Sequence, residues 1–444
     1  MHESRQHTPI VSIALASFIG TCIEWYDFFL YGTAAALVFG PLFFSPQLSP
    51  VVAQLSAFAT FGVGFAARPV GGMFFGHFGD RLGRKTILIL TLIIMGTATF
   101  FIGCLPTYHE VGLLAPLLLV FLRLAQGFAV GGEWGGAVLM ATEHSPDGRR
   151  GFYGSWPQMG APVGLFFSSL IFSVLSSTLS KQAWLAFGWR LPFLLSIVLI
   201  GVGMFIRLRI SESPDFERIK ATQTRKKVPL VHVLRTNFKT VFLATGASFA
   251  VYGPFYIFTT FLLFYGKAIQ IPGATILTGI LCGAVAQIIA ILCAATLSDR
   301  IGRRRPVYLL GVICIGLVIL PTFWLINTRV PLLINLALIL GIGTLGLVYG
   351  PQAAFFSELF DANVRYSGAS FSYQMASLFA GGLTPLIATA LLAHFNTSSL
   401  PIALYLIGLA VITLICAFFI KERPPTEITK EECLAEVAQI GVRK

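Results

Sequence analysis

The chain consists of twelve long apolar runs separated by short polar breaks, and the length of these runs is its most restrictive feature. A hydrocarbon core about 30 Å thick requires a helix of roughly 20 apolar residues. Backbone amides in lipid must bond within their own segment, which selects helices, and the runs lack the alternating polarity of barrel strands. We therefore predict an all-α membrane protein with about twelve transmembrane helices. The predicted spans are 11–39, 52–79, 86–106, 112–142, 153–178, 187–208, 240–266, 273–298, 306–326, 330–357, 366–393 and 399–420.

Composition argues against a soluble protein and against several other classes. Only 11% of the residues are charged, whereas a soluble chain carries about a quarter. The seven cysteines are scattered and form no CxxC pair, which indicates neither a disulfide framework nor a metal site. A nucleotide-binding P-loop is absent from the sequence, so we expect no ATP-driven transport and no cofactor. Because the first run carries Glu24 and Asp27, it is typical of a retained span and not of a cleaved signal peptide.

Basic residues between the predicted spans fall almost entirely on one side of the membrane. The opposite side receives only Lys181, Arg190, Lys267 and Arg329. Cytoplasmic loops are the ones enriched in Lys and Arg, so both termini are predicted to be cytoplasmic. This asymmetry also accounts for the net charge of +12, which therefore gives no reason to expect a nucleic-acid partner.

The two halves of the chain repeat each other. The segment GDRLGRK at 79–85 recurs as SDRIGRRR at 298–305, each time after an even-numbered span. A glutamate and an arginine seven residues apart also follow the fourth and the tenth spans. Duplicated halves are typical of transporters that alternate between two open sides. We predict two pseudo-symmetric six-helix bundles at 1–210 and 240–421, a cytoplasmic linker at 211–239 that is either an interfacial helix or a plain linker, and a cytoplasmic tail at 422–444.

The pattern G-x-x-x-D-R-x-G-R-K from Gly76 to Lys85 resembles the signature loop of the major facilitator superfamily. Its second copy departs from the pattern at the first position, where Ala295 replaces glycine. Further segments resemble the metabolite:proton symporter family within that superfamily: IEWYDFFLYG (23–32), ARPVGGMFFGHFGDRLGRK (67–85), RLAQGFAVGGEWGGA (123–137), GWRLPF (188–193) and VRYSGASFSYQ (364–374). The resemblance implies a bacterial inner membrane. It also implies a substrate such as shikimate, a dicarboxylate, citrate, proline or betaine, carried with protons.

Charged residues at the ends of these spans are predicted to form a cytoplasmic gate. A carboxylate at a helix end can pair with arginines and with the positive N-terminus of a neighbouring helix, and such contacts would break when the halves separate. The alternative is that these charges only fix the topology. The candidate gate residues are Asp80, Arg81, Arg84, Glu143, Arg150, Asp299, Arg300, Arg303, Glu358 and Arg365.

Five ionisable residues are clear cases inside predicted spans, where a charge is costly unless it faces a cavity or a partner. They are Glu24, Asp27, Arg68, Arg123 and Glu133. Positions along the spans allow one pair between Asp27 and Arg123 and a second between Arg68 and Glu133. One carboxylate then lacks a basic partner, and burial penalises its charged form, which favours a role in proton coupling. The choice among the three acids stays open, and so does a purely structural role for all five.

Substrate contacts are expected from polar side chains on otherwise apolar helices, although such side chains often bond only to an adjacent helix. Arginine suits a carboxylate through paired hydrogen bonds, so Arg123 points to a small organic acid. The candidate substrate-binding residues are Tyr31, Arg123, Gln158, Tyr252, Tyr256, Gln287, Tyr373 and Gln374.

We therefore predict a monomeric secondary transporter that imports a small organic acid or zwitterion with protons by alternating access. A proton-independent facilitator or an exporter of the same fold remains as an alternative. A membrane-embedded enzyme or receptor is disfavoured, because the longest loop supplies neither a catalytic constellation nor an extramembrane domain.

Overall fold

The computed structural model describes residues 10–82, 84–146, 148–208, 236–360 and 365–422. Within these ranges the regular structure is helical without any strand, and 12 helices are long and apolar enough to cross a membrane. Each begins and ends within four residues of a span predicted from the sequence. The prediction of an all-helical protein with about twelve spans is confirmed.

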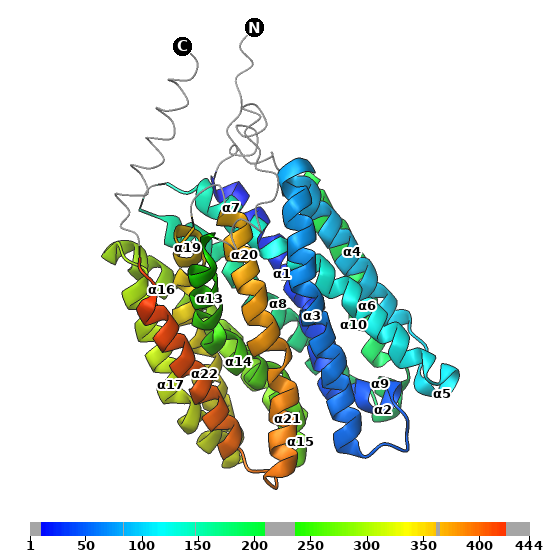
Figure 1. Ribbon diagram of the computed structural model, residues 1–444. Helices are drawn as coiled ribbons and strands as arrows, with labels where there is room; N and C mark the ends of the chain where they lie inside the picture. The colour runs from blue at the N-terminus through cyan, green and yellow to red at the C-terminus, as the bar shows by residue number, and fades with distance from the viewer. Residues whose placement is uncertain (1–9, 83, 147, 209–235, 361–364, 423–444) are drawn as a thin grey trace, which may run out of the picture.

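The first six spans form one bundle, drawn from blue to green in Figure 1. Its long helices differ in regularity, because the first span contains a π-helical segment and the fourth is split at Gly132. The elements are α1 (Ile10–Ala34), η1 (Ala35–Phe39), α2 (Gly40–Phe43), α3 (Pro50–Leu82), α4 (Arg84–Cys104), α5 (Tyr108–Val111), α6 (Leu114–Gly131), α7 (Glu133–Glu143), α8 (Arg150–Thr178), α9 (Lys181–Ala186), η2 (Gly188–Arg190) and α10 (Leu191–Leu208).

The last six spans form the second bundle, drawn from green to red in Figure 1. The seventh span, like the first, contains a π-helical segment, and the eleventh contains another. The elements are α13 (Phe238–Ala247), α14 (Phe249–Tyr256), η3 (Ile257–Phe261), α15 (Leu262–Ala268), α16 (Gly273–Ile301), α17 (Arg305–Asn327), α18 (Pro331–Gly343), α19 (Leu345–Glu358), α20 (Arg365–Ala376), η4 (Ser377–Gly382), α21 (Thr384–His394) and α22 (Leu400–Phe419).

Two sets of helices join the bundles. The fifth span, α8, packs against α16 and α19, and the second span, α3, packs against α20, η4 and α21. In Figure 1 α3 and α20 stand next to each other where the blue and orange helices meet. The region between these two contacts is a seam to which both bundles contribute side chains, and buried polar residues are concentrated along it.

Close packing of α3 against α6 determines where the two central arginines lie. A Cβ atom added to Gly127 would fall 1.8 Å from the carbonyl oxygen of Gly64, so only glycine allows the two backbones to approach this closely. Arg68 follows Gly64 by one helical turn on α3, and Arg123 precedes Gly127 by one turn on α6. Because α3 and α6 run parallel, the backbones of the two arginines lie on opposite sides of this contact along the helix axes, and that of Arg68 packs against Gly131.

Parts of the predicted domain map fall outside the described residues. The linker is described only from residue 236, and the tail only at residue 422. The boundaries 1–210, 211–239, 240–421 and 422–444 remain predictions, although the helices on either side of the linker belong to different bundles (Figure 1).

Candidate functional site

Two arginines are buried at the seam and form no ion pair with a carboxylate of the described residues. Arg68 is 1% exposed and Arg123 is 0% exposed. Arg123 donates from Nη1 to Oε1 of Gln126 at 3.1 Å, while its Nε and Nη2 have no partner among the described residues. All three guanidinium nitrogens of Arg68 likewise lack a partner there. Unpaired buried donors are costly, so this pair of cations is poised to accept an anion.

Aromatic rings hold both guanidinium groups. The Cζ atoms of Arg68 and Arg123 each lie 4.4 Å from the ring centroid of Phe28. Phe65 lies 4.3 Å from the first of these Cζ atoms, and Tyr31 lies 4.2 Å from the second. Cation–π contacts of this kind compensate part of the charge but supply no hydrogen-bond acceptor. The rings therefore orient the arginines and leave their N–H groups free.

The second bundle closes this cluster with Tyr256 of α14. Its ring centroid lies 5.2 Å from that of Phe65 and 5.6 Å from that of Phe61. The hydroxyl of Tyr256 is buried without a partner among the described residues, and so is that of Tyr252 one turn earlier. Two of the predicted substrate residues thus present free hydroxyls at the seam. Tyr31 differs, because it donates to Oγ1 of Thr60 at 2.7 Å.

Asp27 lies deep in the first bundle and does not pair with Arg123. Oγ of Ser196 donates to Oδ1 of Asp27 at 2.5 Å, and the aspartate is 1% exposed. The expected Asp27–Arg123 pair is therefore wrong. The reason is that Asp27 faces α10, whereas Arg123 points into the rings of Phe28 and Tyr31.

Glu133 pairs with Arg207, so the expected pair with Arg68 is also wrong. The guanidinium of Arg207 donates to the carboxylate of Glu133 and to the backbone carbonyl of Leu88. The carboxyl group of Glu24 lies beside that of Glu133, and the charges of both Arg207 and Arg68 act on it. Arg207 was not among the intramembrane charges identified from the sequence, although it lies within the predicted span 187–208. Its place inside that apolar run was the signal that could have identified it.

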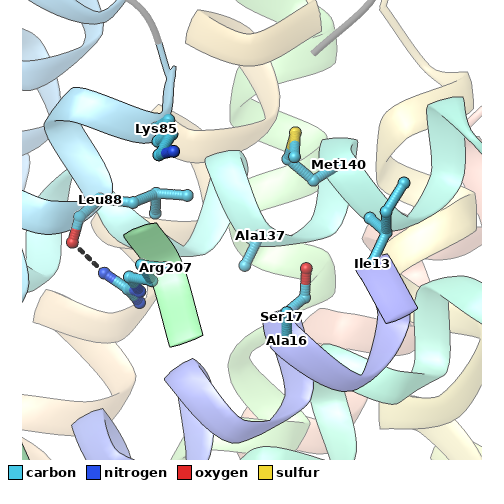
Figure 2. A pocket seen from close by; sticks show the side chains of 8 residues that line it. All are labelled: Ile13, Ala16, Ser17, Lys85, Leu88, Ala137, Met140 and Arg207. Atoms are coloured by element: carbon cyan, nitrogen blue, oxygen red, sulfur yellow. Dashed lines mark hydrogen bonds between the residues drawn. The ribbon is translucent and has the colours of Figure 1, made fainter. Parts of the chain in front are cut away.

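Arg207 also lines a small pocket next to this cluster. Figure 2 shows Arg207 and Leu88 on one side of the pocket, with Ile13, Ala16 and Ser17 of α1 on the other. Lys85, Ala137 and Met140 complete the lining, which is mostly apolar. The pocket therefore lies beside Arg207 and next to Lys85 near the start of α4 (Figure 2).

Three of the predicted substrate residues instead connect the bundles. Nε1 of Trp134 donates to Oε1 of Gln158 at 2.9 Å, and Nε2 of Gln158 donates to the Tyr349 carbonyl at 3.2 Å. The rings of Trp134 and Tyr373 stack at 3.8 Å and 6° across the seam. Gln374 donates from Nε2 to the carbonyl of Gly131 at 3.2 Å. These side chains form contacts between the two bundles. This agrees with the alternative left open by the sequence, that polar side chains on apolar helices often bond only to an adjacent helix.

Gln287 is the remaining candidate for substrate binding. It is buried on α16, and its Oε1 has no hydrogen-bond partner among the described residues. None of the contacts described for it reaches either central arginine, so its role stays a prediction.

One end of the seam is fastened by the second copy of the repeated loop. Oδ1 and Oδ2 of Asp299 accept hydrogen bonds from the backbone amides of Gly151 at 2.9 Å and Phe152 at 2.7 Å, at the start of α8. Arg304 donates to Asp299 at 2.5 Å and lies 3.5 Å from Glu358. Arg304 is not among the predicted gate residues, although it lies in the run of three arginines at 303–305 that the sequence shows.

Other predicted gate residues are more peripheral. Arg300 is exposed, and Arg365 donates to the Phe360 carbonyl at 3.4 Å. Arg303 has a mostly solvated side chain and lies 3.5 Å from Glu422, whose side chain is 7% exposed. Glu143 ends α7 and Arg150 begins α8. The side chains of Asp80, Arg81 and Arg84 lie outside the described residues.

The opposite end of the seam has a contact that sequence reasoning did not predict. Lys267 of α15 donates from Nζ to the backbone carbonyls of Leu37 at 3.1 Å and Ala36 at 3.4 Å, in η1 of the other bundle. Gln54 donates to the preceding carbonyl, that of Ala35, at 3.0 Å. A π-helical turn leaves backbone carbonyls without their usual helical partner. No pattern in the sequence predicted this turn.

Comparison with known proteins gives a consistent result. The family model described as Major Facilitator Superfamily matches residues 17–382 and 273–438. The chain is 39% identical over 429 residues to the inner membrane metabolite transport protein YhjE of Escherichia coli strain K12, covering 95% of this chain and 97% of the relative. It is 41% identical over 414 residues to the shikimate transporter of the same strain, covering 92% and 94%. A D-xylose-proton symporter structure superposes with a TM-score of 0.72 at 16% identity, covering 94% and 99%, which shows the shared fold.

Proposed function

Because the chain belongs to the major facilitator superfamily, it is a multi-pass transporter of metabolites and not an enzyme, and we propose that it imports a small organic acid together with protons. The observation that carries this proposal is the pair of buried arginines at the seam, whose free N–H groups suit an anion. A neutral sugar or a cation would supply no negative charge to either guanidinium group.

Alternating access is supported by contacts at both ends of the seam. At one end Asp299 accepts from the first amides of α8, and at the other Lys267 donates to carbonyls of η1. Each contact joins one bundle to the other, so each must break when its own end opens. We assign the Asp299 end to the cytoplasm, with both termini on that side of a bacterial inner membrane, from the asymmetry of basic residues.

Proton coupling is supported by two acidic sites in the first bundle. Asp27 has a serine hydroxyl as its partner, and a hydroxyl can donate to a carboxylate or accept from a carboxylic acid. Asp27 can therefore lose or gain a proton without losing its hydrogen bond. Glu24 and Glu133 lie together beside Arg207, and two neighbouring carboxyl groups can share one proton. We propose Asp27 as the principal coupling residue, with the second cluster as its competitor.

Uptake into proteoliposomes tests this function. We expect the purified protein to be a monomer. It would be reconstituted and given labelled shikimate, dicarboxylates, citrate, proline and betaine, with and without an inward proton gradient. We expect accumulation of an organic acid that requires the gradient. In Asp27→Asn accumulation should be lost while exchange of internal for external substrate survives.

Other outcomes would change the assignment. Equilibration that ignores the gradient would refute coupling and leave a facilitator, and net movement outward would identify an exporter. Accumulation that persists in Asp27→Asn but fails in Glu133→Gln would transfer the coupling role to the second cluster.

A further inference from the structure

The pocket beside Arg207 lies next to the two neighbouring acids of the first bundle, displaced from them along the helices. On α7, Glu133 begins the helix, and Ala137 of the pocket follows it by one turn. On α1, Ser17 of the pocket precedes Glu24 by two turns. Residues spaced by four or seven positions lie on the same face of a helix. The faces of α1 and α7 that carry the acids therefore continue into the lining of the pocket (Figure 2).

The pocket is displaced toward the end of the bundle that we assign to the cytoplasm. Lys85 lines it near the start of α4 and donates from Nζ to the Leu208 carbonyl at 2.8 Å, at the end of α10. In the predicted topology the start of α4 and the end of α10 are both cytoplasmic, because the loops beside them are rich in basic residues. A proton that passes from the acids through the pocket therefore moves toward the cytoplasm.

The guanidinium group of Arg207 lies between the pocket and the acids. It donates to Oε1 of Glu133, and a Cβ atom added to Gly20 would fall 2.8 Å from its Nη2. Gly20 lies between Ser17 and Glu24 on α1, so the guanidinium crosses α1 where the pocket ends and the acids begin. A fixed positive charge in a narrow passage repels a proton. Arg207 therefore closes the inner end of the pocket while it is paired.

The two acids can hold the proton that would use this passage. Oε2 of Glu133 is buried and has no hydrogen-bond partner among the described residues, and the carboxyl group of Glu24 lies beside it. The charges of Arg207 and Arg68 both act on Glu24, and Tyr349 of the second bundle also interacts with it. Two neighbouring carboxyl groups can share one proton. A proton on Glu133 removes its charge and weakens its pair with Arg207, which frees the passage.

We propose that this pocket is the route by which the Glu24 and Glu133 cluster releases its proton to the cytoplasm, and that Arg207 closes the route while it is paired. The O–H bond of the carboxylic acid breaks, its electron pair stays on the carboxylate, and the proton passes to water held by polar groups such as the Ser17 hydroxyl. The new carboxylate then pairs with Arg207 again. This inference rests on the proposed coupling to protons and adds a cytoplasmic pathway to it.

Filling the pocket tests the route without measuring transport. In a chain without its seven native cysteines, Ser17→Cys would be modified with benzyl methanethiosulfonate, which places a ring in the pocket. Methyl methanethiosulfonate adds a much smaller group to the same sulfur. Infrared spectroscopy follows the exchange of the carboxylic-acid proton for deuterium, and loss of the band in Glu24→Gln or Glu133→Gln identifies it. We expect the benzyl group to slow this exchange by at least about 10-fold and the methyl group to slow it less.

Arg149→Cys is the matched control for the reagent. Arg149 is exposed and does not line the pocket, so the benzyl group there should leave the exchange rate unchanged.

A double variant tests the closing role of Arg207 without leaving an unpaired buried charge. Replacing both partners of the pair in Arg207→Gln/Glu133→Gln keeps Glu24 as the exchanging acid. Its proton should exchange faster than in Glu133→Gln alone, because no fixed positive charge then closes the passage. Equal rates in the two variants would overturn this role.

Other outcomes would overturn the route itself. They are a cysteine at position 17 that reacts with neither reagent, an exchange rate that ignores the benzyl group, equal slowing from Arg149→Cys, and the absence of any carboxylic-acid band that either glutamate variant removes.

Uptake into proteoliposomes separates this inference from the proposed function. With the benzyl group in the pocket, accumulation driven by the proton gradient should be lost while exchange of internal for external substrate survives. If the unmodified protein accumulates substrate and its carboxyl exchange ignores the benzyl group, the proposed function stands without this route. If the unmodified protein accumulates no organic acid, the proposed function itself fails.

Discussion

Replacing Asp299 by asparagine should weaken the contact between α16 and α8 and shift the transporter toward the state in which that end is open. The carboxylate accepts from two backbone amides, at 2.9 Å and 2.7 Å, and pairs with Arg304. Asparagine has nearly the same shape but only one acceptor atom and no charge. At least one hydrogen bond to a charged group is lost, which costs about 2 kcal/mol. That energy corresponds to a roughly 30-fold change in the ratio of closed to open molecules.

Distances between spin labels on the two bundles would measure this shift. Arg149 precedes α8 and Arg300 lies near the end of α16, and both are exposed. The two sites would be changed to cysteine and labelled in a chain without its seven native cysteines, because Cys104, Cys282 and Cys293 are exposed and would react as well. In Asp299→Asn we expect the long-distance population to grow at the expense of the short one.

Arg303→Gln is the matched control. Arg303 lies on the same loop, but its side chain is 65% exposed and its pair with Glu422 spans 3.5 Å. Glu422 keeps its hydrogen bonds from the backbone amides of Arg304 and Arg305, and this pair lies within the second bundle, so the distances between the bundles should hardly change. An unchanged distribution in Asp299→Asn, or equal shifts in both variants, would refute the claim that the Asp299 contact holds this end closed.

Three further predictions concern other parts of the seam and the first bundle. Arg207→Met should lower the thermal unfolding midpoint in detergent, because it leaves a buried carboxylate unpaired at a cost of about 3–5 kcal/mol; adding Glu133→Gln should restore most of it, and no restoration would contradict the pairing. Gly64→Ala places a Cβ 2.5 Å from Nε of the arginine on α6 and should weaken anion binding in calorimetry, whereas Gly201→Ala, with nothing within 4 Å, should match the wild type. In a chain whose only cysteine is one introduced into η1, Lys267→Met should increase labelling by a water-soluble maleimide, and equal labelling with and without the Lys267 change would show that this contact does not keep that end closed.

The spans could be predicted from the sequence because the bilayer imposes a length on each of them. Hydrophobic runs end where charges or helix breakers begin, so span limits are local properties of the chain. The grouping of the gate around Asp299 was also predictable, since the repeated loop marks it. Both predictions use only a local stretch of sequence and require no knowledge of which helices pack together.

Partner choice among the buried charges could not be predicted in the same way. Depth along a span is readable from sequence, but the rotation of each helix about its axis is not. Asp27 and Arg123 were expected to lie at similar depth, yet they belong to faces that point to different neighbours. Arg207 lies one residue before the end of its span, at Leu208, so it was not counted among the charges inside the membrane. Packing of whole helices determines these partners, and a single sequence contains no direct record of it.

The π-helical segments η1 and η3 have a consequence for the history of the chain. They occupy corresponding places in the first spans of the two halves, at Ala35–Phe39 and Ile257–Phe261. Their sequences, AALVF and IFTTF, share only the final phenylalanine. An irregular turn kept at equivalent sites while its side chains diverged is most simply inherited from a single ancestral six-helix unit. The distortion would then be older than the duplication, and older than any difference in substrate among the proteins that descend from it.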